Sequence, residues 1–334
     1  MAQREFVLLL GLQSDTPPTA APEACAPQHG HLHAFVEPLL DVYEGVSVLT
    51  LNRPSARNAI GKQMLQEVRE CIANLRQEPS TRCVLVRSLA SGVFCAGADL
   101  KERRAMSVLE TAEFVGCLRN TFTALRELPM PTIAVLEGLA LGGGAELTLA
   151  CDLRVGGRDA VLGFPETQLG IIPGAGGVHR HGGMAVLLRG SSLSDSDSDS
   201  ACIAGLELHQ PIGSPQACAW PSLPRLIGVS RAKDLIFTGR RVHAEEALTI
   251  GLLDFVVDPG KAYARALQLA GEVCRGGPLA LRAAKSALNG GLDVDLHTGL
   301  RLEESCYAQL LHSKDRAEGL AAFEAKRPPR FTGS

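Results

Sequence analysis

The chain has 334 residues, of which 46% are hydrophobic and 21% charged, and its formal net charge is −3. This profile is typical of a globular chain with enough length for one large domain or two small ones. The nearly neutral balance gives no basic surface for a nucleic-acid partner, and no apolar run reaches the ~18–20 residues of a membrane span.

The ten cysteines are scattered, without a Cys-x-x-Cys pair or histidines at zinc spacing. They predict reduced, mostly buried thiols in an intracellular compartment. His29, His31 and His33 alternate, but nothing nearby completes a metal shell, so no metal site is expected.

Residues 1–38 are predicted to form a leader without stable structure. Prolines break the chain after the short apolar run Phe6–Leu12. A mitochondrial presequence is rich in arginine and poor in acidic residues. Arg4 is the one arginine here and acidic residues accompany it, so the leader supports mitochondrial import only weakly.

Strands and helices alternate in the predicted core, residues 39–258. In chain order the elements are strand 46–51, a helix with apolar positions from 64 to 75, strand 83–87, a helix from 107 and strand 132–136. Ser107 and Glu110 fit a capping box at the start of the second helix. This order predicts an α/β fold with its loops gathered at one end of a sheet.

The remaining third of the chain has mostly helical patterns. Helices are predicted over 230–237, 244–250, 261–274, 278–288 and 295–311, with a strand over 253–257. Residues 259–334 are therefore predicted to be a helical C-terminal region.

Three glycines, Gly142, Gly143 and Gly144, separate strand 132–136 from an apolar helix-like segment that contains Glu146. Glycines let a ligand approach the backbone, and the first amides of a helix are unpaired and favour negative charge. From these residues alone, a tight packing contact remains an equal alternative.

Three segments follow one another in a distinctive order: Phe94–Lys101, Gly142–Glu146, and Pro165-Glu166 with Pro173–Gly177. With this arrangement the chain resembles the enoyl-CoA hydratase (crotonase) family from about Val42 to its C-terminus. The likeness is strongest to mitochondrial enoyl-CoA hydratases of type 2 and to the AU-binding methylglutaconyl-CoA hydratases.

The resemblance implies a crotonase spiral of ββα units followed by helices through which family members form trimers and hexamers. It also implies a mitochondrial matrix enzyme that acts on an acyl-CoA thioester. No cofactor is expected, because coenzyme A is part of the substrate.

The resemblance assigns the backbone amides of Ala98 and Gly143 to the thioester oxygen. Preorganised N–H donors stabilise the negative charge that develops there, and losing one costs ~3 kcal/mol. The small residues Ala96 and Gly142 are expected to leave room for the thioester.

Glu146 and Glu166 match the family's two acidic positions. One charged and one protonated carboxyl group can hold a water molecule and deliver its proton. Glu166 is expected to be the main acid/base and Glu146 its partner, with the division of roles left open. A solvated loop carboxylate is the alternative for Glu166.

Coenzyme A is expected to lie along two turns, Pro54–Asn58, which includes Ala56 and Arg57, and Asp99–Lys101, which includes Leu100. The backbone of Ala56–Asn58 is a candidate for an adenine contact. Lys101 is a candidate for a phosphate contact. Simple solvent exposure is the alternative for Arg57 and Lys101.

The family pattern breaks off after Gly177 and resumes at Leu223. Between them, residues 181–222 form an atypical low-complexity insert with alternating serine and aspartate from Ser194 to Ser200. We expect this insert to bulge out from an intact core and to reduce activity.

The leading hypothesis is an enoyl-CoA hydratase of fatty-acid or branched-chain amino-acid breakdown. A methylglutaconyl-CoA hydratase would need a cation for the distal carboxylate, which the sequence does not place. The alternatives are an RNA-binding side activity, for which helix 62–82 lacks a basic stripe, and an inactive acyl-CoA-binding homologue.

Overall fold

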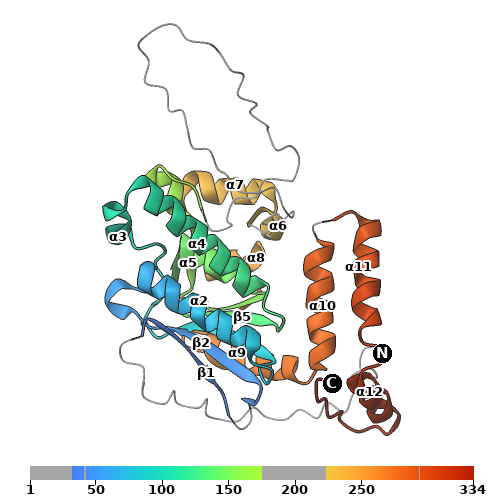
Figure 1. Ribbon diagram of the computed structural model, residues 1–334. Helices are drawn as coiled ribbons and strands as arrows, with labels where there is room; N and C mark the ends of the chain where they lie inside the picture. Colours follow the sequence, from blue (N-terminus) through green and yellow to red (C-terminus); the bar gives the residue numbers. More distant parts are fainter. Residues whose placement is uncertain (1–31, 41–42, 175–222, 293) are drawn as a thin grey trace, which may run out of the picture.

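The computed structural model describes residues 32–40, 43–174, 223–292 and 294–334. The first 31 residues of the predicted leader and the whole predicted insert, 181–222, lie outside the described residues. The described part has the predicted α/β architecture, with helices packed around two sheets and a group of helices at the C-terminal end (Figure 1).

The larger sheet has six strands in the order β1-β2-β3-β5-β7-β10. Five of them run parallel, and β1 pairs antiparallel with β2. Their bounds are β1 Ala34–Pro38, β2 Val46–Leu51, β3 Cys83–Ser88, β5 Thr132–Leu136, β7 Leu153–Gly157 and β10 Phe255–Val257. The four strands predicted from the sequence are therefore confirmed, with small shifts at their ends.

The smaller sheet has four short strands in the order β4-β6-β8-β9. Their bounds are β4 Val93–Cys95, β6 Leu139–Leu141, β8 Val161–Gly163 and β9 Arg241–His243. Strands β4, β6 and β8 each follow a strand of the larger sheet, so the chain repeatedly passes from one sheet to the other and then into a helix or helical turn. This repeat is the ββα unit of the predicted spiral.

Both faces of the larger sheet are covered. Alternate residues of β2, β3 and β5 pack on α9, Ala262–Cys274, and the residues between them face the main core with α2 and α4. The strands are apolar on both faces for this reason, as expected for a parallel sheet.

Two long helices cover the main core, α2 (Lys62–Gln77) and α4 (Val108–Arg126). The predicted apolar face of α2 is confirmed, because its buried residues are Met64, Leu65, Val68, Cys71, Ile72 and Leu75. The predicted capping box of α4 is also confirmed: Ser107 Oγ accepts a hydrogen bond from Glu110 N at 3.2 Å, and Ser107 N donates to Glu110 Oε2 at 2.9 Å.

The predicted leader boundary at residue 38 is wrong, because Ala34–Pro38 forms β1. Ala34 and Phe35 are buried, and Glu67 Oε2 on α2 accepts hydrogen bonds from the amides of His33 and Ala34 at 2.7 and 2.9 Å. Pairing with β2 and the Glu67 carboxylate hold this segment in place. The prolines around it had led to the prediction of no stable structure.

Three helices add to the main core, α6 (Leu223–Ile227), α7 (Val229–Thr238) and α8 (Ala244–Thr249). Beyond α9 lie α10 (Pro278–Gly291), α11 (Leu296–Ala308) and α12 (Lys314–Glu324). The predicted helix 295–311 ends earlier, at Ala308, and α12 was not predicted as a separate helix. Helices α10 and α11 lie side by side next to the main body (Figure 1). Lys285 attaches α10 to the core, since its Nζ donates to Asp152 Oδ2 at 2.7 Å and to Met130 O at 2.9 Å.

Seven cysteines lie in the described part of the chain, and all are free thiols. Four of them are buried and three partly buried, which agrees with the predicted reduced state for these positions. Within the same part, no helix combines the length and the apolar character needed to cross a membrane.

Candidate active site

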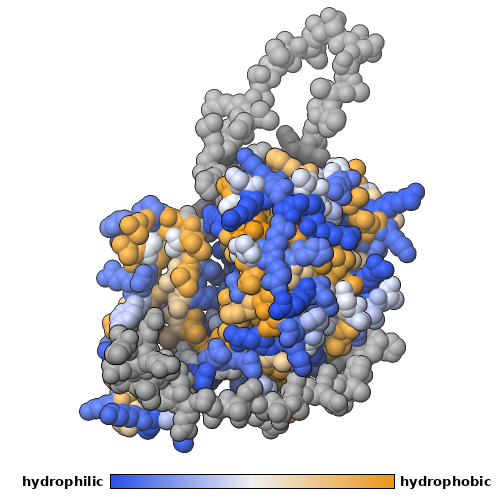
Figure 2. All heavy atoms as spheres, turned by 180° about the vertical axis from the view of Figure 1, so that it is seen from behind, coloured by the Kyte–Doolittle hydropathy of each residue, from blue (hydrophilic) through white to orange (hydrophobic). Residues whose placement is uncertain are grey.

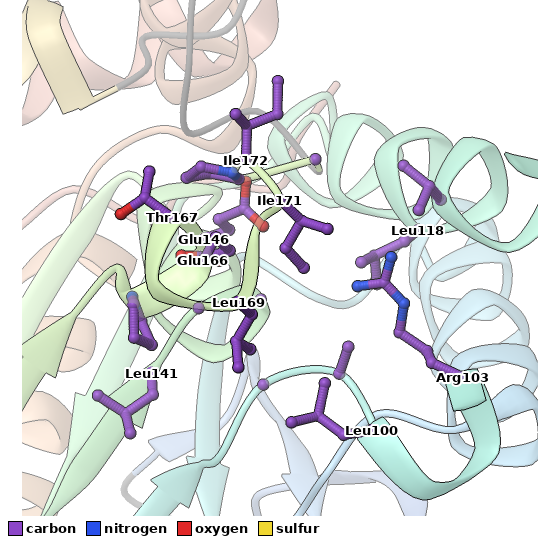
Figure 3. A pocket seen from close by; sticks show the side chains of 18 of the residues that line it. Leu100, Arg103, Leu118, Leu141, Glu146, Glu166, Thr167, Leu169, Ile171 and Ile172 are labelled. Carbon is purple, nitrogen blue, oxygen red and sulfur yellow. The ribbon is translucent and has the colours of Figure 1, made fainter. Parts of the chain in front are cut away.

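A cavity of about 1130 Å³ lies between two short helical segments, the glycine turn and α4 (Figure 3). The short segments are α3, Leu100–Ala105, and the 3₁₀ helix η3, Pro165–Leu169. All four predicted catalytic residues, Ala98, Gly143, Glu146 and Glu166, line this cavity, as do the predicted substrate-binding residues Ala96, Leu100 and Gly142.

The loop around Gly97 and the turn that begins α5, Gly143–Leu149, lie backbone against backbone. A Cβ atom on Gly97 would be 2.7 Å from Leu141 O, and one on Gly144 would be 2.3 Å from Cys95 O. Gly97 also has a φ of +94°, which only glycine adopts readily. Glycine at positions 97 and 144 is therefore required by the close backbone approach.

This approach brings the amides of Ala98 and Gly143 to the same cavity wall. The Cβ position of Gly143 is 3.7 Å from Ala98 N, and that of Gly97 is 3.4 Å from Gly143 N. Neither amide donates a hydrogen bond to another of the described residues. Two adjacent, unpaired N–H donors are available to an oxygen that enters the cavity.

The two acidic residues reach the cavity from different elements. Glu146 is in the first turn of α5 and is 5% exposed, and Glu166 is in η3 and is 8% exposed. Glu166 Oε1 would be 2.8 Å from a Cβ on Gly142, so glycine at this position leaves the space that the carboxyl group fills. Figure 3 shows both side chains close together at the centre of the cavity.

Glu166 has the electrostatic character of a proton-transfer group. Its Oε2 is buried and has no hydrogen-bond partner among the described residues. Burial raises the pKa of the Glu166 carboxyl above its usual value, while a backbone amide and the charge of Arg103 oppose the rise. The alternative of a solvated loop carboxylate is therefore wrong.

Of the two predicted coenzyme A turns, only Leu100 lines the cavity. Ala56, Arg57, Asp99 and Lys101 do not line it, although Arg57 O accepts a hydrogen bond from the cavity residue Ala96 at 3.0 Å. Arg57 and Lys101 are exposed. Their coenzyme A contacts remain predictions.

The side chain of Asp99 is buried and is used inside the protein, while the coenzyme A contact of its turn remains a prediction. Asp99 Oδ1 accepts from the amides of Lys101 and Glu102 at 3.0 and 3.3 Å and so caps α3. Its Oδ2 is 2.8 Å from Arg53 Nη1. The sequence signal for this helix start was an aspartate, Asp99, followed three residues later by the glutamate Glu102. Asp99 positions the helix that lines the cavity.

Sequence reasoning placed Asn58 in a coenzyme A turn but missed the role of its side chain, which joins the two loops beside the cavity. Asn58 is fully buried and accepts from Arg53 N at 2.7 Å. Its amide group donates to Ser88 Oγ at 2.7 Å and to Phe94 O at 2.9 Å. A buried asparagine with a φ of +53° is suited to this turn, because asparagine tolerates left-handed backbone better than most residues.

Stacked ββα units around one cavity with two acidic side chains define an enzyme of the hydro-lyase class with a crotonase fold. The family model described as enoyl-CoA hydratase/isomerase matches residues 41–182 and 202–334. The chain belongs to this family. The gap in the match, 183–201, falls inside the insert predicted from the sequence.

The relatives bear names of hydratases. The probable enoyl-CoA hydratase 2, mitochondrial, of Arabidopsis thaliana is 42% identical over 290 residues, which are 87% of this chain and 82% of the relative. The methylglutaconyl-CoA hydratase, mitochondrial, of Mus musculus is 39% identical over 327 residues, or 95% and 91% of the two chains. The crystal structure of an enoyl-CoA hydratase from Bacillus anthracis has a TM-score of 0.74 and 37% identity, and the match covers 90% of this chain and all of that one.

Proposed function

We propose that this enzyme adds water across the 2,3 double bond of a 2-trans-enoyl-CoA. The observation that supports the proposal is one cavity wall that holds the unpaired amides of Ala98 and Gly143 and the side chains of Glu146 and Glu166. The amides would bind the thioester oxygen and stabilise the enolate-like charge that develops on it.

In this mechanism the two carboxyl groups manage one water molecule. The water oxygen bonds to Cβ while one of its O–H bonds breaks. The electron pair of the double bond moves toward the thioester oxygen, and the proton from the water is delivered to Cα. Glu166 acts as the main acid/base and Glu146 holds the water with it. Two nearby carboxyl groups do not ionise equally, which separates their roles.

The reaction itself is tested with crotonyl-CoA. Hydration removes the conjugated double bond, so ultraviolet absorbance is expected to fall, with kcat/KM of about 10⁴ M⁻¹s⁻¹ or more. Binding of crotonyl-CoA without any loss of absorbance would overturn the proposal and favour an inactive acyl-CoA-binding homologue.

Pathway and compartment form a further part of the proposal. We place the enzyme in the mitochondrial matrix, in fatty-acid or branched-chain amino-acid breakdown, because the relatives above are named mitochondrial. The proposed chemistry needs no cofactor beyond the coenzyme A of the substrate, since amides and carboxyl groups supply the charge stabilisation and the proton transfer.

We also propose a homotrimer or hexamer. Helix α11 buries none of its residues in the single chain, and Leu296 and Leu300 on it are 79% and 55% exposed. Figure 2 shows hydrophobic residues on the surface of the C-terminal helices. A contiguous apolar surface of this kind is typical of a protein interface.

Charges on α11 are expected to break this assembly. The double variant Leu296→Asp and Leu300→Asp should sediment as a monomer at micromolar concentration, whereas the wild type sediments as a trimer or hexamer. Val108→Asp is the control, because Val108 is 87% exposed in the first turn of α4, where an acidic residue is favourable. A monomeric wild type, or a variant that still assembles, contradicts the proposal.

A further inference from the structure

Two elements supply much of the apolar side of the cavity, helix α4 and the segment 171–174 that follows η3. Their apolar side chains on the wall are Phe114, Val115, Leu118, Ile171 and Ile172. An enoyl group that takes up water at Cα and Cβ has only hydrocarbon beyond Cβ, and hydrocarbon is stabilised by contact with such side chains. Under the proposed function, the far part of the acyl group therefore lies between α4 and the segment 171–174.

These two elements meet at Gly174. A Cβ atom on Gly174 would be 3.0 Å from Val115 Cγ1, so the backbone of the segment lies directly on α4. Ile172 is 65% exposed, but the next residue, Pro173, is buried and Gly174 is partly buried. The segment thus passes from the surface onto α4, and the two walls of the cavity close against each other at this contact.

Arg119 on α4 fastens the contact. Its Nε and Nη2 donate hydrogen bonds to Gly174 O at 3.2 and 3.1 Å. Val115 and Arg119 are four residues apart, so they lie on the same face of the helix and contact the same glycine. Within the described part of the chain, Gly174 makes no other hydrogen bond, so Arg119 is what ties it to α4.

The proposed hydration chemistry does not use Arg119. The amides of Ala98 and Gly143 stabilise the charge on the thioester oxygen, and Glu146 and Glu166 handle the proton. A guanidinium group stays charged in any protein environment, so the hold of Arg119 on the segment does not depend on pH. Its place on the cavity wall therefore has a structural consequence for the acyl group rather than a chemical one.

We propose that Arg119 is a positioning residue that, by holding Gly174 against Val115, closes the apolar end of the cavity and limits the length of the acyl chain that the enzyme hydrates. This inference rests on the proposed function. With the hydrogen bonds in place, a long chain has to displace packed residues, which is unfavourable. Without them, the segment 171–174 can move away from α4, and a long chain can enter between the two.

The anchor should affect acyl chains of different length unequally. Crotonyl-CoA has a single methyl group beyond Cβ, whereas 2-dodecenoyl-CoA has a long hydrocarbon chain that must reach the apolar end. Loss of the anchor should therefore change the ratio of the two kcat/KM values. The expected change is about 5- to 10-fold, because hydrogen bonds at an exposed arginine contribute modestly.

The test measures kcat/KM for crotonyl-CoA, 2-octenoyl-CoA and 2-dodecenoyl-CoA. In the wild type, kcat/KM should fall along this series. Arg119→Gln should raise the ratio of 2-dodecenoyl-CoA to crotonyl-CoA about 5- to 10-fold over the wild-type ratio. Arg104→Gln is the matched control and should leave the ratio unchanged, because Arg104 is exposed and does not line the cavity.

A second variant opens the same end of the cavity without removing the anchor. Val115→Ala takes away the side chain on which Gly174 packs and keeps both hydrogen bonds of Arg119. It should also raise the ratio. An unchanged ratio in Val115→Ala overturns the inference even if Arg119→Gln does not fold, since the acyl chain then does not reach the contact between α4 and the segment.

The remaining outcomes separate this inference from the proposed function. Equal losses for all three thioesters in Arg119→Gln would show that Arg119 serves only stability or binding of the common coenzyme A part, and would overturn the inference. A wild type that hydrates 2-dodecenoyl-CoA as well as crotonyl-CoA also overturns it but leaves the proposed function standing. Hydration of none of the three thioesters overturns the proposed function itself.

Discussion

Replacing Glu166 by glutamine is expected to lower kcat for crotonyl-CoA hydration about 10²- to 10⁴-fold, the usual contribution of a general acid or base. The amide has the same shape and fills the same space beside Gly142, but it cannot accept and return a proton. Acyl-CoA binding should persist, because the amides of Ala98 and Gly143 are untouched. Stopped-flow absorbance gives the rate and calorimetry with a saturated acyl-CoA gives the affinity.

The same variant should change how stability depends on pH. Burial raises the pKa of Glu166, so the wild type loses stability as the pH rises through the folded-state pKa and an ionised carboxylate must be buried. Glutamine carries no charge at any pH. Glu166→Gln should therefore gain thermal stability over the wild type at about pH 8, and this gain should shrink toward about pH 4, where both side chains are neutral.

Glu113→Gln is the control for both measurements. Glu113 is exposed on α4 and lies outside the cavity wall, so its replacement should change neither kcat nor the pH dependence of stability. If Glu166→Gln keeps more than about a tenth of the wild-type rate, Glu166 is not the main acid/base, since proton transfer contributes at least about 10².

The sequence predicted the long elements of the fold because each has a strong internal pattern. Helix α2 repeats its apolar residues at helical spacing and buries all six of those expected, and the capping box of α4 fixes where that helix begins. The smaller sheet was not predicted. Its strands have three residues each, too few for any period to emerge, and they exist because each pairs with a neighbour that is distant in the chain.

Site residues could be predicted from the sequence at positions where the backbone geometry allows only one type of residue. Gly97, Gly142 and Gly144 are required by close backbone or carboxyl contacts, and such positions leave a clear mark in the sequence. The place of Arg103 on the cavity wall could not be predicted in the same way. Its direction follows from where α3 begins, and that start is fixed by the Asp99 cap and its contact with Arg53.

Replacing Gly97 by alanine is expected to lower kcat at least 10²-fold, the usual effect of losing one donor to a developing oxyanion. The new Cβ would be 2.7 Å from Leu141 O and 3.4 Å from Gly143 N, and a φ of +94° is strained for alanine. Because the overlap is with backbone, the two segments must separate. The amides of Ala98 and Gly143 would then no longer reach one oxygen.

Gly92→Ala separates this effect from general backbone strain. Gly92 also has a positive φ, +68°, but nothing lies within 4 Å of its Cβ position, and it is not part of the cavity wall. It should lose roughly 1–2 kcal/mol of stability to the left-handed backbone and keep its rate per folded molecule. Rates measured where circular dichroism shows both variants folded decide the matter. If Gly97→Ala turns over normally, or Gly92→Ala slows equally, the spacing of the two amides does not control the reaction, and the thioester oxygen must be stabilised by other groups.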